Sequence, residues 1–212
     1  MPVFFQHQIN AGTRLGIWKI EETEEFFRAN VPLHRDVTHP HKRLQHLAGR
    51  FLLQYLFPAF PYELVQIADT RKPFLPGEQY HFSISHCGDY AAAIVSRTSR
   101  AGIDIEIPVQ KIMRIRDKFL SEEEKKWEGE HREWPAVKGE LYPSQFTTLL
   151  WSAKEAVFKW YGDGGVDFSE HIRLEPPRME TNTMDCFFSK TGTPLTLQYR
   201  LFDQLVLVWV IS

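Results

Sequence analysis

The chain has 212 residues, of which 43% are hydrophobic and 14% aromatic, so it can bury one large core or two small ones. A formal net charge of −2 provides no global positive field, which argues against nucleic acid as a partner and assigns anion binding to local basic groups. Cys87 and Cys186 are too few for a disulfide scaffold and form no CxxC pair. No window reaches the roughly eighteen apolar residues of a membrane span and no signal peptide is evident, so we expect a cytoplasmic protein without a membrane partner.

The first half of the chain is predicted to contain two helices and several strands. A strand is expected over 14–20, and the run Glu21-Glu22-Thr23-Glu24-Glu25 predicts an acidic helix over 21–30, because negative charge is favourable at a helix N-terminus. Apolar residues at helical spacing predict a second helix over 41–57. Beyond it the hydrophobic period shortens towards two, which predicts strands near 63–67, 80–85, 90–96 and 102–107.

Two further helices are predicted in the middle of the chain. The first is indicated by apolar residues at helical spacing, which are Ile112, Ile115 and Phe119. Ser121 and Glu124 form a capping-box pattern, so the second helix is expected to begin at Ser121 and to run to about residue 133. A loop is expected over 134–142.

The C-terminal part predicts one helix followed by sheet. Residues 151–159 contain no Gly, Pro or turn cluster and are rich in good helix formers. The run Tyr161-Gly162-Asp163-Gly164-Gly165 ends this helix, because glycine readily adopts the left-handed conformation of a helix C-terminus. The remaining residues predict strands that begin near 173 and then cover 185–189, 195–202 and 205–211.

The stretch over 101–108 contains two acids in an apolar surrounding. In an extended chain its three isoleucines share one face, while Asp104 and Glu106 share the other. Adjacent carboxylates repel each other unless a cation or a donor lies between them. Mg2+ takes oxygen ligands, so the pair predicts a metal site. The alternative is the exposed polar face of an amphipathic strand.

A third carboxylate is expected on the next predicted helix. Trp151, Glu155 and Phe158 fall on one helical face, so this acid lies among aromatic side chains. Lys154 and Lys159 flank it, either as ordinary solvated charge or as a means of holding an anionic substrate beside a metal. Glu155 is therefore a candidate to complete the acidic site.

Several groups in the first half are candidates for phosphate binding. Ser85 and His86 end a predicted strand, where a hydroxyl and an imidazole suit a phosphate oxygen, although neighbours in a strand face opposite ways and cannot act as nucleophile and base. The stiff loop with Lys72 and Pro73 could offer backbone groups to a flat ligand, or be a plain connector. The helix over 41–57 has a basic face, either solvated or phosphate-binding, made of Lys42, Arg43, His46 and Arg50.

Three segments of the sequence form a combined pattern. They are Phe82-Ser83-Ile84-Ser85-His86, Gly102-Ile103-Asp104-Ile105-Glu106 and Trp151-Ser152-Ala153-Lys154-Glu155-Ala156-Val157-Phe158-Lys159, in that order. Each motif alone is weak, but together they resemble the 4'-phosphopantetheinyl transferase superfamily, and the length resembles its longer single-chain, Sfp-like class. The resemblance spans at least residues 72–165. It implies an α+β fold: a pseudo-dimer of two similar α+β halves with the active site between them.

The resemblance implies an enzyme that transfers the phosphopantetheine arm of coenzyme A to a serine of an apo acyl or peptidyl carrier protein. Mg2+, or alternatively Mn2+, would be present, and 3',5'-ADP would be released. Residues 1–100 would form the coenzyme A side, and residues 101–212 would hold the metal and dock the carrier. A chain that contains both halves need not dimerise, so we expect a monomer. Two alternatives remain: another Mg2+-dependent enzyme acting on a phosphate ester or nucleotide, and a non-catalytic module that binds coenzyme A or a carrier.

The resemblance also implies roles for the acidic and neighbouring residues. Asp104, Glu106 and Glu155 would bind the metal, and Glu155, Lys159 and Asp104 would be the catalytic residues. Glu155 would take the proton of the carrier serine, either directly or through a bound water.

The implied contacts with coenzyme A come mainly from the first half. Ser85 and His86, with Lys159, would contact phosphates, and Lys72 with Pro73 would line the adenine side. The family places an arginine before the glycine that corresponds to Gly49, and here the spacing differs. We assign the 3'-phosphate to Arg43, with two alternatives, Lys42 and Arg50.

A basic cluster follows the acidic strand. Because carrier proteins of this kind are typically acidic where they dock, the cluster is a candidate docking surface, whereas most such faces are merely solvated. Its residues are Lys111, Arg114, Arg116 and Lys118.

Overall fold

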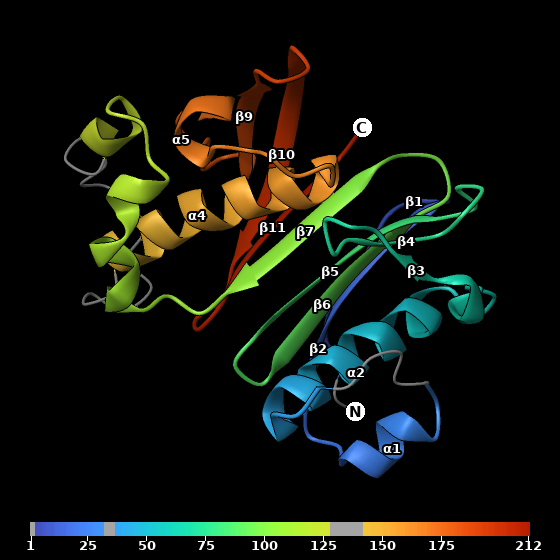
Figure 1. Cartoon of the computed structure of the whole chain (residues 1–212). Coiled ribbons are helices and arrows are strands. Elements are labelled where there is room, and N and C mark those ends of the chain that lie inside the picture. The colour runs from blue at the N-terminus through green and yellow to red at the C-terminus, as the bar shows by residue number, and fades with distance from the viewer. Residues whose placement is uncertain (1–2, 32–36, 128–141) are drawn as a thin grey trace. The chain divides into compact units, whose positions relative to one another are not determined.

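The computed structural model describes residues 3–31, 37–127 and 142–212 (Figure 1). The chain divides into two compact units, Met1–Ile103 and Asp104–Ser212. The division falls within strand β7 (Ala101–Glu106). Each unit combines a β-sheet with one long helix, so the described residues form a mixed helix-and-sheet protein, as the fold class predicted. The pseudo-dimeric relation of the halves and the roles of 1–100 and 101–212 stay predictions.

The first unit contains a four-stranded antiparallel sheet. Across the sheet the strands are β1 (Val3–Asn10), β2 (Thr13–Lys19), β6 (Tyr90–Ser96) and β5 (His81–Cys87). The helices of this unit are α1 (Glu24–Arg28) and α2 (Pro40–Leu56). A separate two-stranded ribbon consists of β3 (Gln66–Ile67) and β4 (Pro73–Phe74), and a 3-10 turn covers Tyr62–Leu64.

Helix α2 confirms the predicted helix to within one residue at each end. It packs on β6, β2 and β5 (Figure 1) through fully buried leucines such as Leu47 and Leu52. At Gly49 the helix comes so close to β5 that a Cβ would lie 2.6 Å from Ile84 Cγ2. Only glycine fits this contact without a shift of the neighbouring side chain, so Gly49 sets the separation of helix and sheet.

Helix α1 is shorter than the predicted helix over 21–30, since it covers only Glu24–Arg28. The acids before it have other partners: the Lys19 ammonium lies 2.6 Å from Glu21, and the Trp18 indole donates to Glu22 at 2.9 Å. These contacts hold the two acids outside the helix. Strand β1 was not predicted, because its apolar residues do not alternate regularly with polar ones along the strand.

The second unit contains a five-stranded sheet. Across it the strands are β7, β11 (Val206–Ile211), β10 (Thr193–Leu201), β9 (Thr183–Phe188) and β8 (Ile172–Leu174). Its helices are α4 (Tyr142–Tyr161), which packs on β11, and the one-turn α5 (Phe168–His171) (Figure 1). The predicted C-terminal strands are confirmed, and α4 extends further towards the N-terminus than the predicted 151–159. It ends with a Gly162 N–H···O=C Phe158 bond of 2.9 Å at a glycine with φ of 81°.

The segment between β7 and α4 differs from its prediction. Residues 110–114, 116–118 and 124–126 form 3-10 turns instead of α-helices. The capping box is nevertheless present, because Ser121 N–H donates to Glu124 Oε2 at 2.8 Å and Glu124 N–H donates to Ser121 Oγ at 3.2 Å. The continuation of this predicted helix beyond Trp127 and most of the predicted loop lie outside the described residues.

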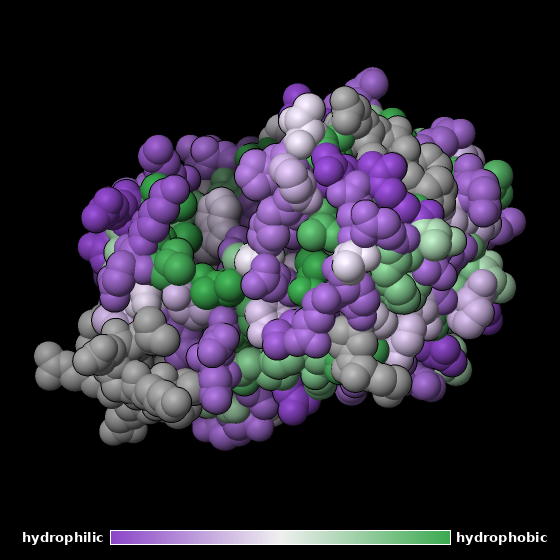
Figure 2. All heavy atoms as spheres, turned by 90° about the horizontal axis from the view of Figure 1, so that it is seen from below, coloured by the Kyte–Doolittle hydropathy of each residue, from purple (hydrophilic) through white to green (hydrophobic). Residues whose placement is uncertain are grey.

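The surface is that of a globular protein. Hydrophilic residues cover most of the face in Figure 2, and hydrophobic residues are exposed there in small groups. Among the helices that the structure describes, none combines the length and the apolar character needed to cross a membrane.

Candidate active site

Asp104 lies on β7 and is buried, with 2% of its surface exposed. Its carboxylate accepts hydrogen bonds from Ser152 Oγ at 2.8 Å and from the Lys159 ammonium at 2.5 Å. Both donors come from α4, on which Ser152 and Lys159 are seven residues apart and so lie on one side of the helix. The alternative of a solvated polar face is therefore wrong for Asp104.

Glu106 follows two residues later on the same face of β7, as the alternation of a strand requires. The Trp151 indole N–H donates to Glu106 Oε1 at 3.3 Å. Trp151 is itself held by aromatic neighbours, since its ring lies 5.0 Å from Phe119 and 5.6 Å from Phe168 between centroids. The first turn of the 151–159 motif thus contacts the second acid of the β7 motif.

Glu155 lies in the same electrostatic environment. Burial, repulsion from Asp104 and repulsion from Glu106 raise the pKa of the Glu155 carboxyl from 4.5 to about 7, and the nearby Lys159 offsets part of this shift. Lys159 Nζ lies 4.0 Å from Glu155 Oε2. The three predicted acids and Lys159 are therefore brought together in one unit, between β7 and α4.

The carboxylates of Asp104, Glu106 and Glu155 are suitable ligands for a divalent metal, because Mg2+ and Mn2+ prefer carboxylate oxygens. The mutual repulsion that raises the pKa of Glu155 is the kind that a bound cation relieves. In the arrangement described, however, the positive charge beside Asp104 is the Lys159 ammonium. Within residues 3–31, 37–127 and 142–212, no three His, Cys, Asp or Glu side chains are grouped as ready metal ligands.

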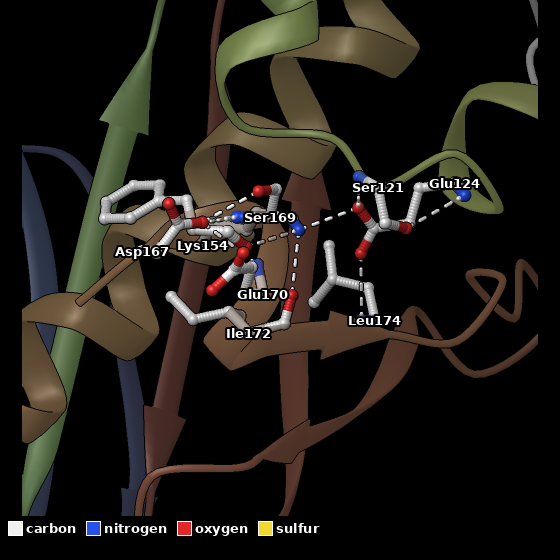
Figure 3. Close-up of polar contacts among 9 residues, drawn as sticks. Ser121, Glu124, Lys154, Asp167, Ser169, Glu170, Ile172 and Leu174 are labelled. Carbon is white, nitrogen blue, oxygen red and sulfur yellow. Dashed lines mark hydrogen bonds and ion pairs between the residues drawn. The ribbon is translucent and has the colours of Figure 1, made fainter.

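Lys154, next to Glu155 in the motif, faces another part of the second unit. Its side chain is fully buried, and its ammonium lies 2.7 Å from Glu124 Oε2 (Figure 3). Both suggested roles, a solvated charge and a holder of anionic substrate, are therefore wrong for Lys154. Burial lowers the pKa of Lys154, and the adjacent Glu124 opposes this shift.

The candidates for coenzyme contacts lie in the first unit. Ser85 is buried and His86 is exposed on β5, in keeping with side chains that alternate along a strand. Lys72 and Pro73 are half-buried at the start of the β3–β4 ribbon, where the Lys72 carbonyl accepts a 2.9 Å bond from Ala68 N–H. Pro73 therefore begins β4, one of the two strands of this ribbon, and Lys72 directly precedes it.

The basic residues of α2 have different surroundings. The Arg43 guanidinium donates to Glu24 at 2.8 Å and to the Val37 carbonyl at 2.7 Å, and Lys42 is exposed. Arg50 is buried and donates to the Tyr62 hydroxyl at 3.1 Å, so its placement on a shared basic face is wrong.

Sequence reasoning missed two contacts of the 151–159 motif, one made by Ser152 and one made by Glu124. Ser152 was part of the quoted motif but received no role, although a hydroxyl three residues before Glu155 on a helix is a signal for a shared face. Glu124 was predicted only as a cap, and its pairing with Lys154 joins residues thirty apart, which no local pattern indicates.

The chain is similar in sequence to known proteins of one superfamily. A family model described as the 4'-phosphopantetheinyl transferase superfamily matches residues 100–208. Enterobactin synthase component D of Escherichia coli (strain K12) is 38% identical over 121 residues, which are 56% of this chain and 54% of that protein. The 4'-phosphopantetheinyl transferase AcpT of Salmonella typhi is 30% identical over 162 residues, which are 74% of this chain and 80% of that protein.

The match thus spans about half the length of the enterobactin synthase component and most of AcpT. The family model covers the whole of β7 and α4. It therefore includes all four residues of the candidate site, which are Asp104, Glu106, Glu155 and Lys159. On these matches, the chain belongs to the 4'-phosphopantetheinyl transferase superfamily.

Proposed function

We propose that the protein transfers the 4'-phosphopantetheine arm of coenzyme A to a serine of an apo acyl or peptidyl carrier protein, with Mg2+ as cofactor and 3',5'-ADP as the second product. The observation that carries this proposal is the meeting of Asp104, Glu106, Glu155 and Lys159 in a member of this superfamily. Grouped carboxylates cost free energy, and a cluster with a strongly perturbed pKa is typical of a functional site.

In the proposed reaction the carrier serine Oγ attacks the phosphorus bonded to the pantetheine oxygen. The bond from that phosphorus to the oxygen of the departing 3',5'-ADP breaks, and the serine proton is transferred to a base. Glu155 is the candidate base, because its carboxylate belongs to the cluster, with Oε2 4.0 Å from Lys159 Nζ, and a carboxylate that is not tightly held by a metal can accept the serine proton. It would accept the proton directly or through a bound water.

The remaining groups of the cluster would position and neutralise the diphosphate. Lys159 would donate to a diphosphate oxygen, which requires its ammonium to leave Asp104. When bound, Mg2+ would supply further charge neutralisation at the diphosphate, with Asp104, Glu106 and Glu155 as its oxygen ligands. Ser152 would keep Asp104 oriented through its 2.8 Å hydrogen bond.

The first unit would contribute the other contacts with coenzyme A. Ser85 and His86 are assigned to phosphates, and Lys72 with Pro73 to the adenine side. Arg43 is kept as the candidate for the 3'-phosphate, where phosphate oxygens would replace its bond to Glu24. Exposed Lys42 is the alternative for this contact, and Arg50 is withdrawn because it is buried against Tyr62.

The basic cluster after β7 is proposed as the carrier-docking surface. Lys111, Arg114 and Lys118 are exposed on the 3-10 turns, and Arg116 is half-buried. Exposed cations raise the rate of encounter with an acidic partner and lose this effect as salt increases. The names of the enterobactin synthase relatives direct the first test to a peptidyl carrier, with an acyl carrier beside it.

Intact mass measurement of an apo-carrier tests the proposal directly. Incubation with protein, coenzyme A and Mg2+ should add the mass of one phosphopantetheine to the carrier, and 3',5'-ADP should appear in equal amount. Omission of coenzyme A, replacement of the carrier serine by alanine, and excess chelator should each prevent the mass gain.

Two results would favour the alternatives. Cleavage of coenzyme A at the same rate with and without a carrier would indicate a phosphate-ester hydrolase. Metal-dependent binding of coenzyme A with no turnover on either class of carrier would indicate a binding module. Both results contradict transfer to a carrier serine.

A further inference from the structure

The ion pair between Lys154 and Glu124 is buried and fully hydrogen-bonded, yet it has no part in the proposed chemistry. The three donors of the ammonium go to Glu124 Oε2 at 2.7 Å, the Phe168 carbonyl at 2.9 Å and the Ile172 carbonyl at 2.8 Å. Both side chains are essentially inaccessible, with 0% and 2% exposed. Such a pair is costly to bury unless each partner is satisfied, as both are here.

The ion pair bonds to the backbone of β8, the edge strand of the five-stranded sheet. Strand β8 is the last strand of the order β7-β11-β10-β9-β8, so one side of it has no strand among the described residues. The residues flanking β8 bond towards β9, through Ser189 N–H to the His171 carbonyl and Glu175 N–H to the Asp185 carbonyl. Because backbone groups alternate along a strand, Ile172 and Leu174 direct theirs to the open side.

The ion pair satisfies two of these outward groups, one carbonyl and one N–H. Lys154 donates to the Ile172 carbonyl at 2.8 Å, and Glu124 Oε1 accepts from Leu174 N–H at 3.1 Å (Figure 3). One lysine and one glutamate thus supply the donor and the acceptor that a sixth strand would supply. A cavity of about 890 Å³ lies alongside, with Ser121, Glu124 and Leu174 in its lining.

The same contact anchors helix α4 from one side. On another side of the helix, Ser152 and Lys159 bond to Asp104 on β7. Consecutive residues of an α-helix differ by about 100° around the axis. The contacts that fix the directions of Lys154 and Ser152 therefore also fix the direction in which Glu155 leaves the helix. Contacts on two sides leave α4 little freedom to rotate or slide along its axis.

We propose that the Lys154–Glu124 pair caps the β8 edge in place of a strand and thereby fixes the rotation of α4, so that Glu155 is directed at Asp104 and Glu106. Lys154 is then a positioning residue that acts through Glu155. The positioning part rests on the proposed function, whereas the capping part does not.

The first arm of the test measures capping by hydrogen–deuterium exchange. In the double variant Lys154→Met/Glu124→Met, the β8 peptide should exchange at least about tenfold faster, because Leu174 N–H loses its acceptor, Glu124 Oε1. In Lys154→Met, which removes only the donor to the Ile172 carbonyl, the increase should be smaller. The matched control is Lys125→Met, which breaks an exposed ion pair with Glu122 one residue from Glu124 and should leave β8 exchange unchanged. Unchanged β8 exchange in the double variant would overturn the capping.

The second arm measures positioning in the double variant, which replaces the whole pair by apolar side chains and leaves no unpaired charge in the interior. At a temperature where the double variant is folded, kcat for carrier modification should fall by about tenfold to a hundredfold, as for other groups that orient a metal ligand, while KM for coenzyme A stays within about threefold. The affinity for Mn2+, measured by electron paramagnetic resonance in the presence of coenzyme A, should fall by about tenfold.

The outcomes separate the two ideas. A folded double variant with wild-type kcat and wild-type Mn2+ affinity would overturn positioning, even if β8 exchange is fast. If the wild-type protein modified no carrier, the proposed function and the positioning that rests on it would fail together, and the exchange arm would still decide the capping.

Discussion

Helix α4 carries two lysines that pair with acids from distant segments, and the two pairs differ in their surroundings. Lys154 and Glu124 are both inaccessible, and all their bonds go to fixed groups of the same unit. Lys159 is 24% exposed, and its partner Asp104 lies near two further acids. The first pair has every group satisfied, whereas beside the second pair burial and repulsion from Asp104 and Glu106 raise the pKa of Glu155. One nine-residue motif therefore contributes Lys154 to a fully bonded buried pair, the proposed anchor, and Glu155 and Lys159 to the proposed reactive site, on different sides of the same helix.

The largest effect should come from the reactive site. Asp104→Asn keeps the shape of the side chain but removes the charge that faces Lys159, and it should lower kcat for carrier modification by about a thousandfold or more. The measurement is initial rate by intact mass at saturating coenzyme A. Ser152→Ala, which removes only one hydrogen bond to Asp104, should lose far less, and equal losses would mean that the charge of Asp104 has no special role.

Loss of the Lys154–Glu124 pair should lower the free energy of unfolding more than loss of the Lys159–Asp104 pair. Lys154→Met leaves Glu124 buried without its cation, and the free energy of unfolding in urea should fall by about 3–5 kcal/mol. Lys159→Met should cost clearly less, because Asp104 keeps its hydrogen bond from Ser152 and loses a partly exposed partner. A Lys159→Met variant as unstable as Lys154→Met would remove the distinction between the two pairs.

The burial of Glu155 and its repulsion from Asp104 and Glu106 predict a pH dependence of stability in chelator. The pKa of Glu155 is raised from 4.5 in the unfolded chain to about 7 in the folded protein, so its ionisation opposes folding. Stability should therefore be highest below about pH 4.5 for this group and decrease by about 1–3 kcal/mol as pH rises to 7.

The difference between wild type and Glu155→Gln isolates this contribution. Thermal melts of both proteins from pH 5 to 8 should show that the variant loses less stability over this range. Parallel pH profiles for the two proteins would contradict the raised pKa.

The smallest effect should come from the exposed cations Lys111 and Arg114. The double variant Lys111→Glu/Arg114→Glu should lower kcat/KM for the carrier by about tenfold at low salt and by little at high salt, because exposed charges act over distance and are screened. The comparison is made at two ionic strengths with KM for coenzyme A as the internal control. A loss independent of salt would assign these residues to folding or direct contact.

Much of the secondary structure followed from local patterns. The helix over 41–57 and the C-terminal strands have long, clear periodicities, and the structure contains them within a few residues. The helix predicted from Ile112, Ile115 and Phe119 was wrong, because a spacing of three to four residues also fits successive 3-10 turns. The predicted helix over 21–30 is short because Glu21 and Glu22 bond to side chains of β2.

The sequence by itself determined which chemical groups the site contains and which face of its strand or helix each occupies. Alternation placed Asp104 and Glu106 together, and helical spacing placed Glu155 beside Trp151. Only the tertiary structure decided which lysine of the motif pairs with which acid, because Lys154 and Lys159 carry the same charge and lie close to Glu155 in the chain. Their roles diverge because Glu124 and the β8 edge meet one side of α4, and β7 meets another.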